Sequence, residues 1–330
     1  MWIIYYKASF FPRPVCRMKK VIMAVVAVLS LVACPLLYFF VGPKLSTDQI
    51  STAKILVIIC GCSMLYCFVV GEITRNNSQM DKLWSILPAV YTWVIAIKGH
   101  MQIRLVMMAC LATLWGARLT FNFARKGAYK LRFWEGEEDY RWPVLREKKE
   151  FKPRWKWVLF DLFFISIYQN ALVLATTMPA LISMRSYAPL NALDYVAMGL
   201  MLGFIVLETI ADEQQWRFQT KKKELLAGGK KLADLPRPYN RGFNTTGLWA
   251  HSRHPNYFAE QCIWISFYIF SIGAGIAILN WSMIGALLLV ALFLGSSEFG
   301  EEISSSKYPQ YAEYKKKVSL FIPWFGTMDK

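Results

Sequence analysis

The sequence predicts an all-α integral membrane protein, a polytopic bundle of eight transmembrane helices with seven as the alternative count. Three observations support this fold class. Of the 330 residues, 55% are hydrophobic and only 18% are charged, whereas about a quarter of a typical soluble domain is charged. The apolar residues gather into nearly uncharged runs, each close to the ~20 residues that a helix needs to cross the hydrocarbon. Lysine and arginine are dense in some of the segments between these runs and sparse in the others.

Each expected helix corresponds to one apolar run. The runs lie at 21–42, 52–71, 83–98, 101–121, 156–182, 191–211, 256–278 and 281–299. The third run is the shortest. The segment from Met18 to Cys34 has the pattern of a lipoprotein signal, but apolar residues continue past Cys34 and seventeen residues precede Met18. A first transmembrane helix is therefore the favoured interpretation of 21–42.

Lysine and arginine orient these helices. They are concentrated in the N-terminal arm, in the loops at 125–156 and 217–253, and in the C-terminal tail, whereas the intervening segments carry few, such as Lys44 and Arg185. With eight helices every basic segment falls on one side, which the positive-inside rule makes the cytoplasm. Seven helices would break this alternation. We expect a multi-pass protein with cytosolic termini, in the endoplasmic reticulum of a eukaryote or the inner membrane of a bacterium.

The net charge of +16 follows this topology and does not indicate nucleic acid as a partner. Basic loops that contact the anionic headgroups of membrane lipid explain most of it. No obligate protein partner is evident.

Several chemistries are excluded by what the sequence lacks. Most of the seven cysteines lie inside apolar runs, so we expect reduced packing residues. Three histidines are too few for a histidine-rich di-iron desaturase, and no metal site is expected. The chain also lacks a dinucleotide-binding glycine motif, a phosphate-binding loop, an HExxH motif and a nucleophile elbow. A nucleotide cofactor would have to bind among the helices and cytosolic loops.

Two carboxylates stand near the cytosolic end of the sixth predicted helix. Glu208 and Asp212 are four residues apart and therefore share a helix face, which Gln215 and Trp216 continue. Carboxylates at this spacing repel each other unless a ligand with hydrogen-bond donors bridges them. The alternative is a helix end that meets water at the membrane surface.

The stretch "GLWAHSRHPNYFAEQ" at 247–261 places polar groups at the start of the seventh helix. Pro255 suits the first turn of a helix, and Ser252 is a natural N-cap. Asn256 and Glu260 then face inward if three apolar residues face lipid: Phe258, Ile263 and Ile265.

Arg253 and His254 precede this helix, where free amides and the helix dipole favour an anion. This arrangement predicts a phosphate-binding position with the side chains of Asn256 and Glu260 below it. The alternative is an ordinary loop-to-helix junction at the membrane surface.

Earlier in the chain, Asp81 and Trp84 lie at the mouth of the third helix, and Trp115, Arg118 and Asn122 form a stripe near the cytosolic end of the fourth. A charge inside an apolar run is costly unless it is paired. Asp81 is a reasonable partner for Arg118, and such a pair could be catalytic or structural.

Five stretches together resemble a known family. "GLWAHSRHPNYFAEQCIW", "ETIADEQQWRFQ", "KYPQYAEYKKKVSLFIPWF", "DKLWSILP" and "LWGARLTFNFARKGAY" are similar to the steroid 5-alpha-reductase family, in particular to a largely uncharacterised membrane branch. The resemblance divides the chain into a basic arm (1–20), N-terminal helices (21–74), a reductase-like membrane domain (75–325) and a short tail (326–330).

This resemblance implies a membrane-embedded, NADPH-dependent reductase that acts on a carbon–carbon double bond of a lipophilic, steroid- or lipid-like substrate. The implied cofactor-binding residues are Glu208, Asp212, Arg253, His254, Asn256, Tyr257 and Glu260. The implied catalytic positions are Asp81, Trp84, Trp115 and Arg118. "WSILP" replaces the family's Gln-Glu pair and Trp115 stands where its Tyr would be, which weakens the case for a steroid enone.

Hydride addition to a double bond conjugated to a carbonyl needs an acid near the oxygen and a dry cavity. Asp81 could serve as that acid if burial keeps it protonated. One alternative is an S-adenosylmethionine-dependent methyltransferase of the isoprenylcysteine carboxyl type, which also carries an RHPxY element ahead of a Glu. A second alternative is a non-enzymatic lipid-binding protein.

Overall fold

The computed structural model describes Phe40 and residues 44–328 of the chain. The expected basic arm at 1–20 and the first predicted helix at 21–42 lie outside the described residues, apart from Phe40. The described part is helical and holds no strand, only an isolated bridge between Ser252 and Ser319.

Long helices dominate the bundle: α2 (Thr47–Thr74), α5 (Ile103–Ala124), α10 (Ala192–Ala227), α11 (Pro255–Gly273) and α12 (Ile284–Lys307). A further rod is assembled from α7 (Arg154–Phe160), the π-helix η1 (Asp161–Tyr168), α8 (Gln169–Thr176) and α9 (Met178–Ser183). The short α-helices are α3 (Gln79–Trp84), α4 (Leu87–Lys98), α6 (Arg141–Arg146) and α13 (Tyr311–Lys317). The 3₁₀ turns are η2 (Leu232–Asp234), η3 (Tyr239–Arg241), η4 (Gly247–Ala250) and η5 (Trp281–Met283).

Within the described residues, five segments are long and apolar enough to cross a membrane. They are Thr47–Thr74, Ile103–Ala124, Arg154–Ser183, Ala192–Ala227 and Trp281–Lys307. These segments indicate an integral membrane protein and confirm the helical bundle, while the count of eight stays a prediction.

The predicted third span at 83–98 is broken in the structure. α3 ends at Trp84 and α4 begins only at Leu87, so the regular helix is 12 residues long. Pro88, in the first turn of α4, has no backbone N–H with which to continue a helix from α3. At ~1.5 Å per residue, α4 covers about 18 Å, too little to cross the hydrocarbon alone.

Helix α2 buries one narrow stripe of its surface in the core and leaves apolar side chains exposed on its other faces. Its buried residues form a narrow stripe that includes Leu56, Cys60 and Cys67, while apolar side chains such as Val57 and Leu65 are largely exposed. A helix that is apolar on both faces is suited to lipid on one side and protein on the other.

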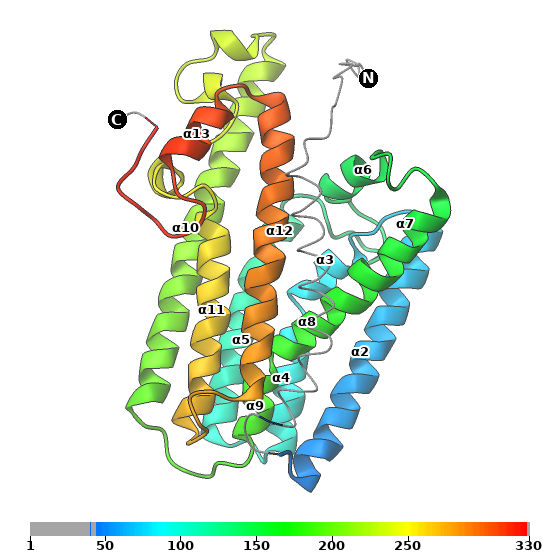
Figure 1. The fold of residues 1–330 in the computed structure, drawn as a ribbon, viewed down its shortest axis with the longest axis vertical. Coiled ribbons are helices and arrows are strands. Elements are labelled where there is room, and N and C mark those ends of the chain that lie inside the picture. Colours follow the sequence, from blue (N-terminus) through cyan, green and yellow to red (C-terminus); the bar gives the residue numbers. More distant parts are fainter. Residues whose placement is uncertain (1–39, 41–43, 329–330) are drawn as a thin grey trace.

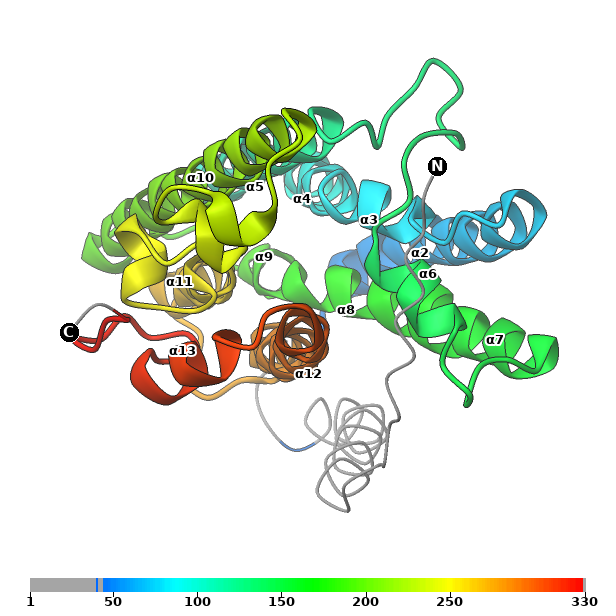
Figure 2. The same cartoon turned by 90° about the horizontal axis from the view of Figure 1, so that it is seen from above.

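The helices run roughly side by side, and the basic connecting segments gather at one end (Figure 1). α10 and α11 form the most extensive pairing, α4 packs along α5, and α12 packs on α8. Seen from above, α8 and α9 lie between α11 and α2 (Figure 2). The end with α6, α13 and the last turns of α10 carries the loops that the sequence predicts to be cytosolic, and its sidedness stays a prediction.

A buried ion pair, Arg104–Asp194, lies at the opposite end of the bundle. Arg104, in the first turn of α5, contacts Asp194 of α10 through Nε–Oδ1 at 2.8 Å and Nη2–Oδ2 at 2.9 Å. The Arg104 side chain is 2% exposed and that of Asp194 is fully buried. The guanidinium also donates to the backbone oxygens of Ala188, Pro189 and Gly273. These bonds tie α5 and α10 to the end of α11.

Cysteine labelling tests the sidedness. We expect a cysteine introduced at Lys44, before α2, to react with an impermeant maleimide only from the non-cytosolic side. A cysteine at the exposed Asp234 is the matched cytosolic control. Labelling of both positions from the cytosolic side would contradict the topology.

Candidate functional site

Helices α5 and α10 meet in a buried cluster of charges. Arg118 of α5 places Nη1 2.6 Å from Asp212 Oδ2 and Nη2 2.5 Å from Glu208 Oε1, the second contact without the alignment of a hydrogen bond. Glu208 is 2% exposed. The predicted pair between Asp81 and Arg118 is therefore wrong, because both carboxylates of α10 already surround the guanidinium.

Two amide side chains complete the surroundings of Asp212. Asn122, one turn after Arg118, donates from Nδ2 to Asp212 Oδ2 at 2.8 Å. Asn256, in the first turn of α11, donates to Asp212 Oδ1 at 3.2 Å. The structure thus joins the predicted stripe on α5, the carboxylate pair on α10 and the polar start of α11 at one point.

Glu260 lies one turn further along α11. Its Oε1 accepts a 3.1 Å hydrogen bond from Trp84 Nε1, at the end of α3. Trp115 is fully buried and packs edge-on against Trp264, with ring centroids 5.0 Å apart. Glu260 is 6% exposed, so it faces inward as predicted. Aromatic rings therefore line the part of the cluster that lies deeper in the bundle.

The orientation of α11 was only partly predicted. Ile265 is 45% exposed, but Ile263 is fully buried in the core, so the expectation that it faces lipid is wrong. Ile263 lies one turn after the buried Ala259 and one turn before the buried Phe267, and it shares their inward face.

The cluster holds more acid than base. The charge of Arg118 acts on Glu208, Asp212 and Glu260. The neighbouring Arg125 reaches Asp212 only at its backbone oxygen, since its charge pairs with Glu213. Several buried polar atoms of these elements have no hydrogen-bond partner within the described part of the chain: Glu208 Oε2, Asn256 Oδ1, Gln215 Oε1, Arg118 Nε and Trp115 Nε1. Buried polar groups are normally paired. The cluster thus has unused acceptors and donors with which to hold a polar molecule.

Asp81 belongs to a neighbouring cluster under the loop that follows α5. Its Oδ2 accepts a 2.8 Å hydrogen bond from Trp142 Nε1, and Oδ1 lies 3.9 Å from Arg141 Nη2. Burial raises the pKa of the Asp81 carboxyl, against the opposing effects of Arg141 and two hydrogen bonds. Arg141 pairs more closely with Asp139, at 2.7 Å, and holds the pKa of Asp139 below its usual range although burial alone would raise it.

Arg253 and His254 are joined to the C-terminal segment. Arg253 Nε lies 2.5 Å from Glu301 Oε1, and Nη1 donates to the backbone oxygens of Lys315 and Val318. His254 Nε2 lies 3.3 Å from the same carboxylate oxygen of Glu301. The His254 ring stacks on Tyr257, with centroids 5.3 Å apart. The phosphate contact predicted for these two side chains would therefore have to coexist with structural bonds.

Ser252 is not the N-cap of α11. Helix α11 begins at Pro255 with His254 at the cap position and no side-chain cap bond. The Ser252 hydroxyl instead donates to the backbone oxygen of Phe321 at 2.6 Å. The hydroxyl reaches this oxygen because the C-terminal segment runs directly beside residues 252–254.

These bonds predict a structural effect of Arg253→Gln. We expect limited proteolysis near α13 to accelerate, because the change leaves Glu301 with fewer donors, at a cost of about 1–3 kcal/mol. Arg237→Gln, in the exposed part of the preceding loop, is the matched control. If Arg253 also binds a cofactor phosphate, salt should weaken binding in the wild type and not in the variant. Equal salt dependence of cofactor binding in the wild type and in Arg253→Gln would show that this arginine serves only the contact with the C-terminal segment.

Further contributors were missed in the sequence: Trp142, Arg141, Asp139, Trp264 and Glu301. They reach the site through contacts with distant segments, which no local spacing predicts. The signal for Glu301 was available, since it is an acidic residue at the end of an apolar run.

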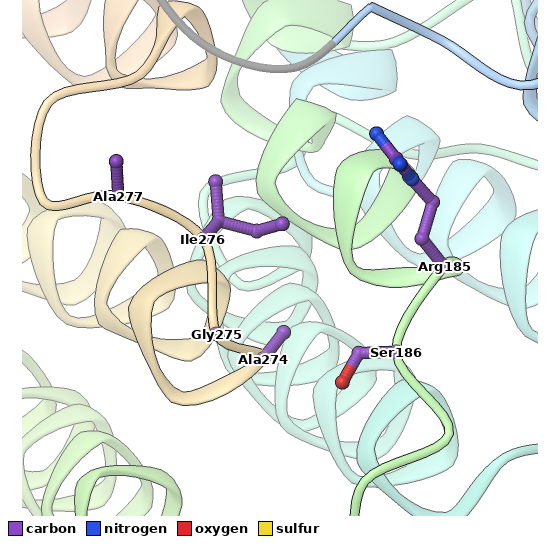
Figure 3. A pocket seen from close by; sticks show the side chains of 6 residues that line it. All are labelled: Arg185, Ser186, Ala274, Gly275, Ile276 and Ala277. Atoms are coloured by element: carbon purple, nitrogen blue, oxygen red, sulfur yellow. The ribbon is translucent and has the colours of Figure 1, made fainter.

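Two open hollows lie on the described surface, away from the charge cluster. One, of about 420 Å³, lies near the bundle end that holds the Arg104–Asp194 pair and is lined by Arg185, Ser186, Ala274, Gly275, Ile276 and Ala277 (Figure 3). The other, of about 500 Å³, runs between α4 and α5 and is lined mostly by apolar residues. Its α5 residues, such as Thr113 and Ala117, lie on the helix face opposite Trp115 and Asn122. Neither hollow contains a predicted site residue.

Comparisons place the chain among related sequences. The family described as "Protein of unknown function (DUF1295)" matches residues 67–318. The chain is 38% identical over 277 residues to "Uncharacterized protein C594.04c" of Schizosaccharomyces pombe, covering 79% of this chain and 78% of the relative. No solved structure matches significantly. The matched region includes every residue of the charge cluster and both acidic residues of the Asp81 cluster.

Proposed function

The chain belongs to the DUF1295 family, and we propose that it is a membrane-embedded NADPH-dependent reductase of the steroid 5-alpha-reductase type. Its substrate would be a lipophilic molecule with a carbon–carbon double bond conjugated to a carbonyl. The proposal joins the sequence resemblance to the geometry of the α5–α10–α11 cluster.

The observation that carries the proposal is the convergence of Arg118, Glu208, Asp212, Asn256 and Glu260 with unused hydrogen-bonding atoms. The carboxamide and ribose hydroxyls of a dinucleotide offer the donors that these acceptors lack. Bound nicotinamide would supply the hydride. Carboxylates beside it would favour the positive charge that the ring gains as the hydride leaves.

The aromatic residues of the cluster suit the substrate side. Trp84 links Glu260 to α3, and Trp115 and Trp264 form the apolar wall deeper in the bundle. A wall of this kind excludes water, which strengthens the electrostatic interactions inside. A lipophilic substrate could therefore be held beside the reacting ring with little hydration.

Asp81 is the proposed acid. Burial raises its pKa, which favours the protonated form that a proton donor requires. Asp81 lies one turn before Trp84 on α3 and accepts a hydrogen bond from Trp142, so the substrate oxygen would have to reach past Trp84 toward the loop after α5. Asp139, with a lowered pKa, is the neighbouring carboxylate that stays ionised.

One observation favours the alternative of a methyltransferase. Three carboxyl groups surround the guanidinium of Arg118, and an acidic lining of this kind also suits the sulfonium and ammonium groups of S-adenosylmethionine. That reaction would need neither a hydride nor a substrate acid.

Thermal shift of the purified full chain in detergent separates these functions. A ligand that binds only the folded protein raises its stability, by about 2.7 kcal/mol at a concentration one hundred times Kd. We expect stabilisation by NADPH and none by S-adenosylmethionine. Stabilisation by S-adenosylmethionine alone would support the methyltransferase, and a response to neither would support a non-enzymatic lipid-binding protein.

A further inference from the structure

A second group of buried polar residues lies where α2 meets η1. Glu72 is in the last turn of α2, Asn77 follows that helix, and Asp161 is the first residue of the π-helix η1. Asn77 and Asp161 are 2% and 1% exposed, whereas the Glu72 side chain is half-buried at the outer edge of the group. A carboxylate inside a transmembrane segment is costly and usually functional, and π-helices often occur at functional sites. These three residues form what we term the α2–η1 carboxyl site.

Unpartnered atoms converge on one point of this site, beside Gly71. A Cβ added to Gly71 would lie 3.4 Å from Asn77 Nδ2 and 3.5 Å from Asp161 Oδ2. Neither of these atoms, nor Glu72 Oε1, has a hydrogen-bond partner among the residues that the structure describes. The amide and both carboxyls are nevertheless within reach of one another, without aligned bonds. The space that glycine leaves open is therefore bounded by one donor, Asn77 Nδ2, and by two acceptors, Asp161 Oδ2 and the backbone oxygen of Asn76 at 3.7 Å. Glu72 reaches this site through its interaction with Asp161.

The orientation of the Asn77 amide is fixed from the other side. Arg146 of α6 donates from Nη1 to Asn77 Oδ1 at 3.1 Å. The amide nitrogen must then point toward Asp161. An N–H directed at the open space disfavours a metal cation there, because the donor's positive end would face the ion.

The charges around the site leave Asp161 without a cation. From α7, Arg154 pairs with Glu72 Oε2, and from α6, Arg146 pairs with Glu138. α2 adds the thiol of Cys67, which accepts a weak hydrogen bond from the neutral Asn170 of α8. Ser166, inside η1, reaches the other oxygen of Asp161 at 3.4 Å. Arg154 neutralises only Glu72, so the facing carboxylate of Asp161 requires another positive charge.

We propose that Glu72 and Asp161 share one proton through a water bound beside Gly71, which makes the α2–η1 carboxyl site a proton-binding site. The water accepts from Asn77 Nδ2 and bridges the two carboxyl oxygens, which satisfies all three unpartnered atoms. The proton removes one of the two negative charges. Its loss leaves two anions across the α2–η1 contact and weakens that contact. The proposal is independent of the reductase function and involves none of its residues.

The pH dependence of stability tests the proton. If the folded protein holds a proton that the unfolded chain releases, stability must fall as pH rises. We expect the apparent Tm of the wild type in sodium-free buffer to fall toward alkaline pH more steeply than that of Asp161→Asn or Glu72→Gln, whose amides need no proton. Asp234→Asn, at an exposed position, should behave as the wild type. Parallel curves for the wild type and both amide variants would overturn the proposal.

Infrared spectroscopy and the addition of sodium chloride test whether the positive charge at the site is a proton or a metal cation. The difference spectrum of wild type minus Asp161→Asn should contain a protonated-carboxyl band that disappears at alkaline pH. Absence of this band would overturn the proposal. Recovery of alkaline stability by added NaCl in the wild type alone would also overturn it, by showing a metal cation at the site.

A pair of glycine substitutions on α2 tests the water position. Gly71→Ala places a methyl group at ordinary contact distance from Asn77 and Asp161, so it fits and displaces the water. Gly61→Ala meets nothing within 4 Å and is the matched control. We expect Gly71→Ala to lower Tm relative to Gly61→Ala and to change the carboxyl band. Equal Tm values and spectra in the two variants would contradict a bound water beside Gly71.

Discussion

Replacing Arg104 by alanine is expected to lower the free energy of unfolding by about 3–5 kcal/mol, because it leaves Asp194 as an unpaired buried charge. Asp194 is fully buried and receives two hydrogen bonds from the guanidinium, at 2.8 and 2.9 Å. The change also removes the donors to three backbone oxygens that connect α5 and α10 with the end of α11. Unfolding of the purified protein in mixed detergent micelles, followed by tryptophan fluorescence, measures this effect.

Two controls separate electrostatics from general damage at this end of the bundle. Lys98→Ala, at an exposed position in the last turn of α4, should change stability by about 0.5 kcal/mol or less. The double variant Arg104→Met/Asp194→Leu should recover part of the loss, since it removes both charges. A loss under 1 kcal/mol in Arg104→Ala would show that the pair contributes little to the fold.

Replacing Arg118 by alanine is expected to cost a similar 3–5 kcal/mol, because Glu208, Asp212 and Glu260 lose their shared cation. The loss should shrink as pH falls, since a protonated carboxyl needs no cation beside it. A pure packing defect would not show this recovery. Unfolding at neutral and mildly acidic pH is the measurement.

The matched control for Arg118 is Arg217. It pairs with Glu213 on the surface of α10, and its side chain is 79% exposed. An exposed pair of this kind contributes about 0.3–0.5 kcal/mol. A pH-independent loss in Arg118→Ala, or equal losses for Arg118→Ala and Arg217→Ala, would contradict the assignment of Arg118 to a buried carboxylate cluster.

Much of the bundle follows from hydropathy alone. Six apolar runs, at 52–71, 101–121, 156–182, 191–211, 256–278 and 281–299, coincide with long helical segments of the structure. The period of the helix also placed Glu208 and Asp212 on one face, since four residues make about one turn. Where helices end was harder to predict. Helix α10 continues to Ala227, well beyond the predicted end at 211, and Pro88 shortens α4.

Contacts between helices could not be predicted from local pattern. Arg118 was paired with Asp81 on composition, whereas the structure pairs it with α10, because α5 packs on α10 at that level. The Arg104–Asp194 pair was overlooked although both residues lie inside predicted spans. A charge in an apolar run is itself a signal that a partner exists. Its identity depends on the packing of helices that are distant in sequence.

The proposed reaction requires that the α5–α10–α11 cluster bind the reacting end of NADPH. NADPH titration of the wild type and of Asn256→Ala tests it most directly, because Asn256 touches Asp212 and has an unused oxygen at the cluster. Loss of one buried polar contact should cost about 1–3 kcal/mol, or about 5–150-fold in Kd. Gln310→Ala, at an exposed position before α13, is the control. We expect saturable binding that Asn256→Ala weakens by at least fivefold, with the Kd of Gln310→Ala unchanged. Equal Kd values in the wild type and Asn256→Ala, or no NADPH binding at all, would contradict it.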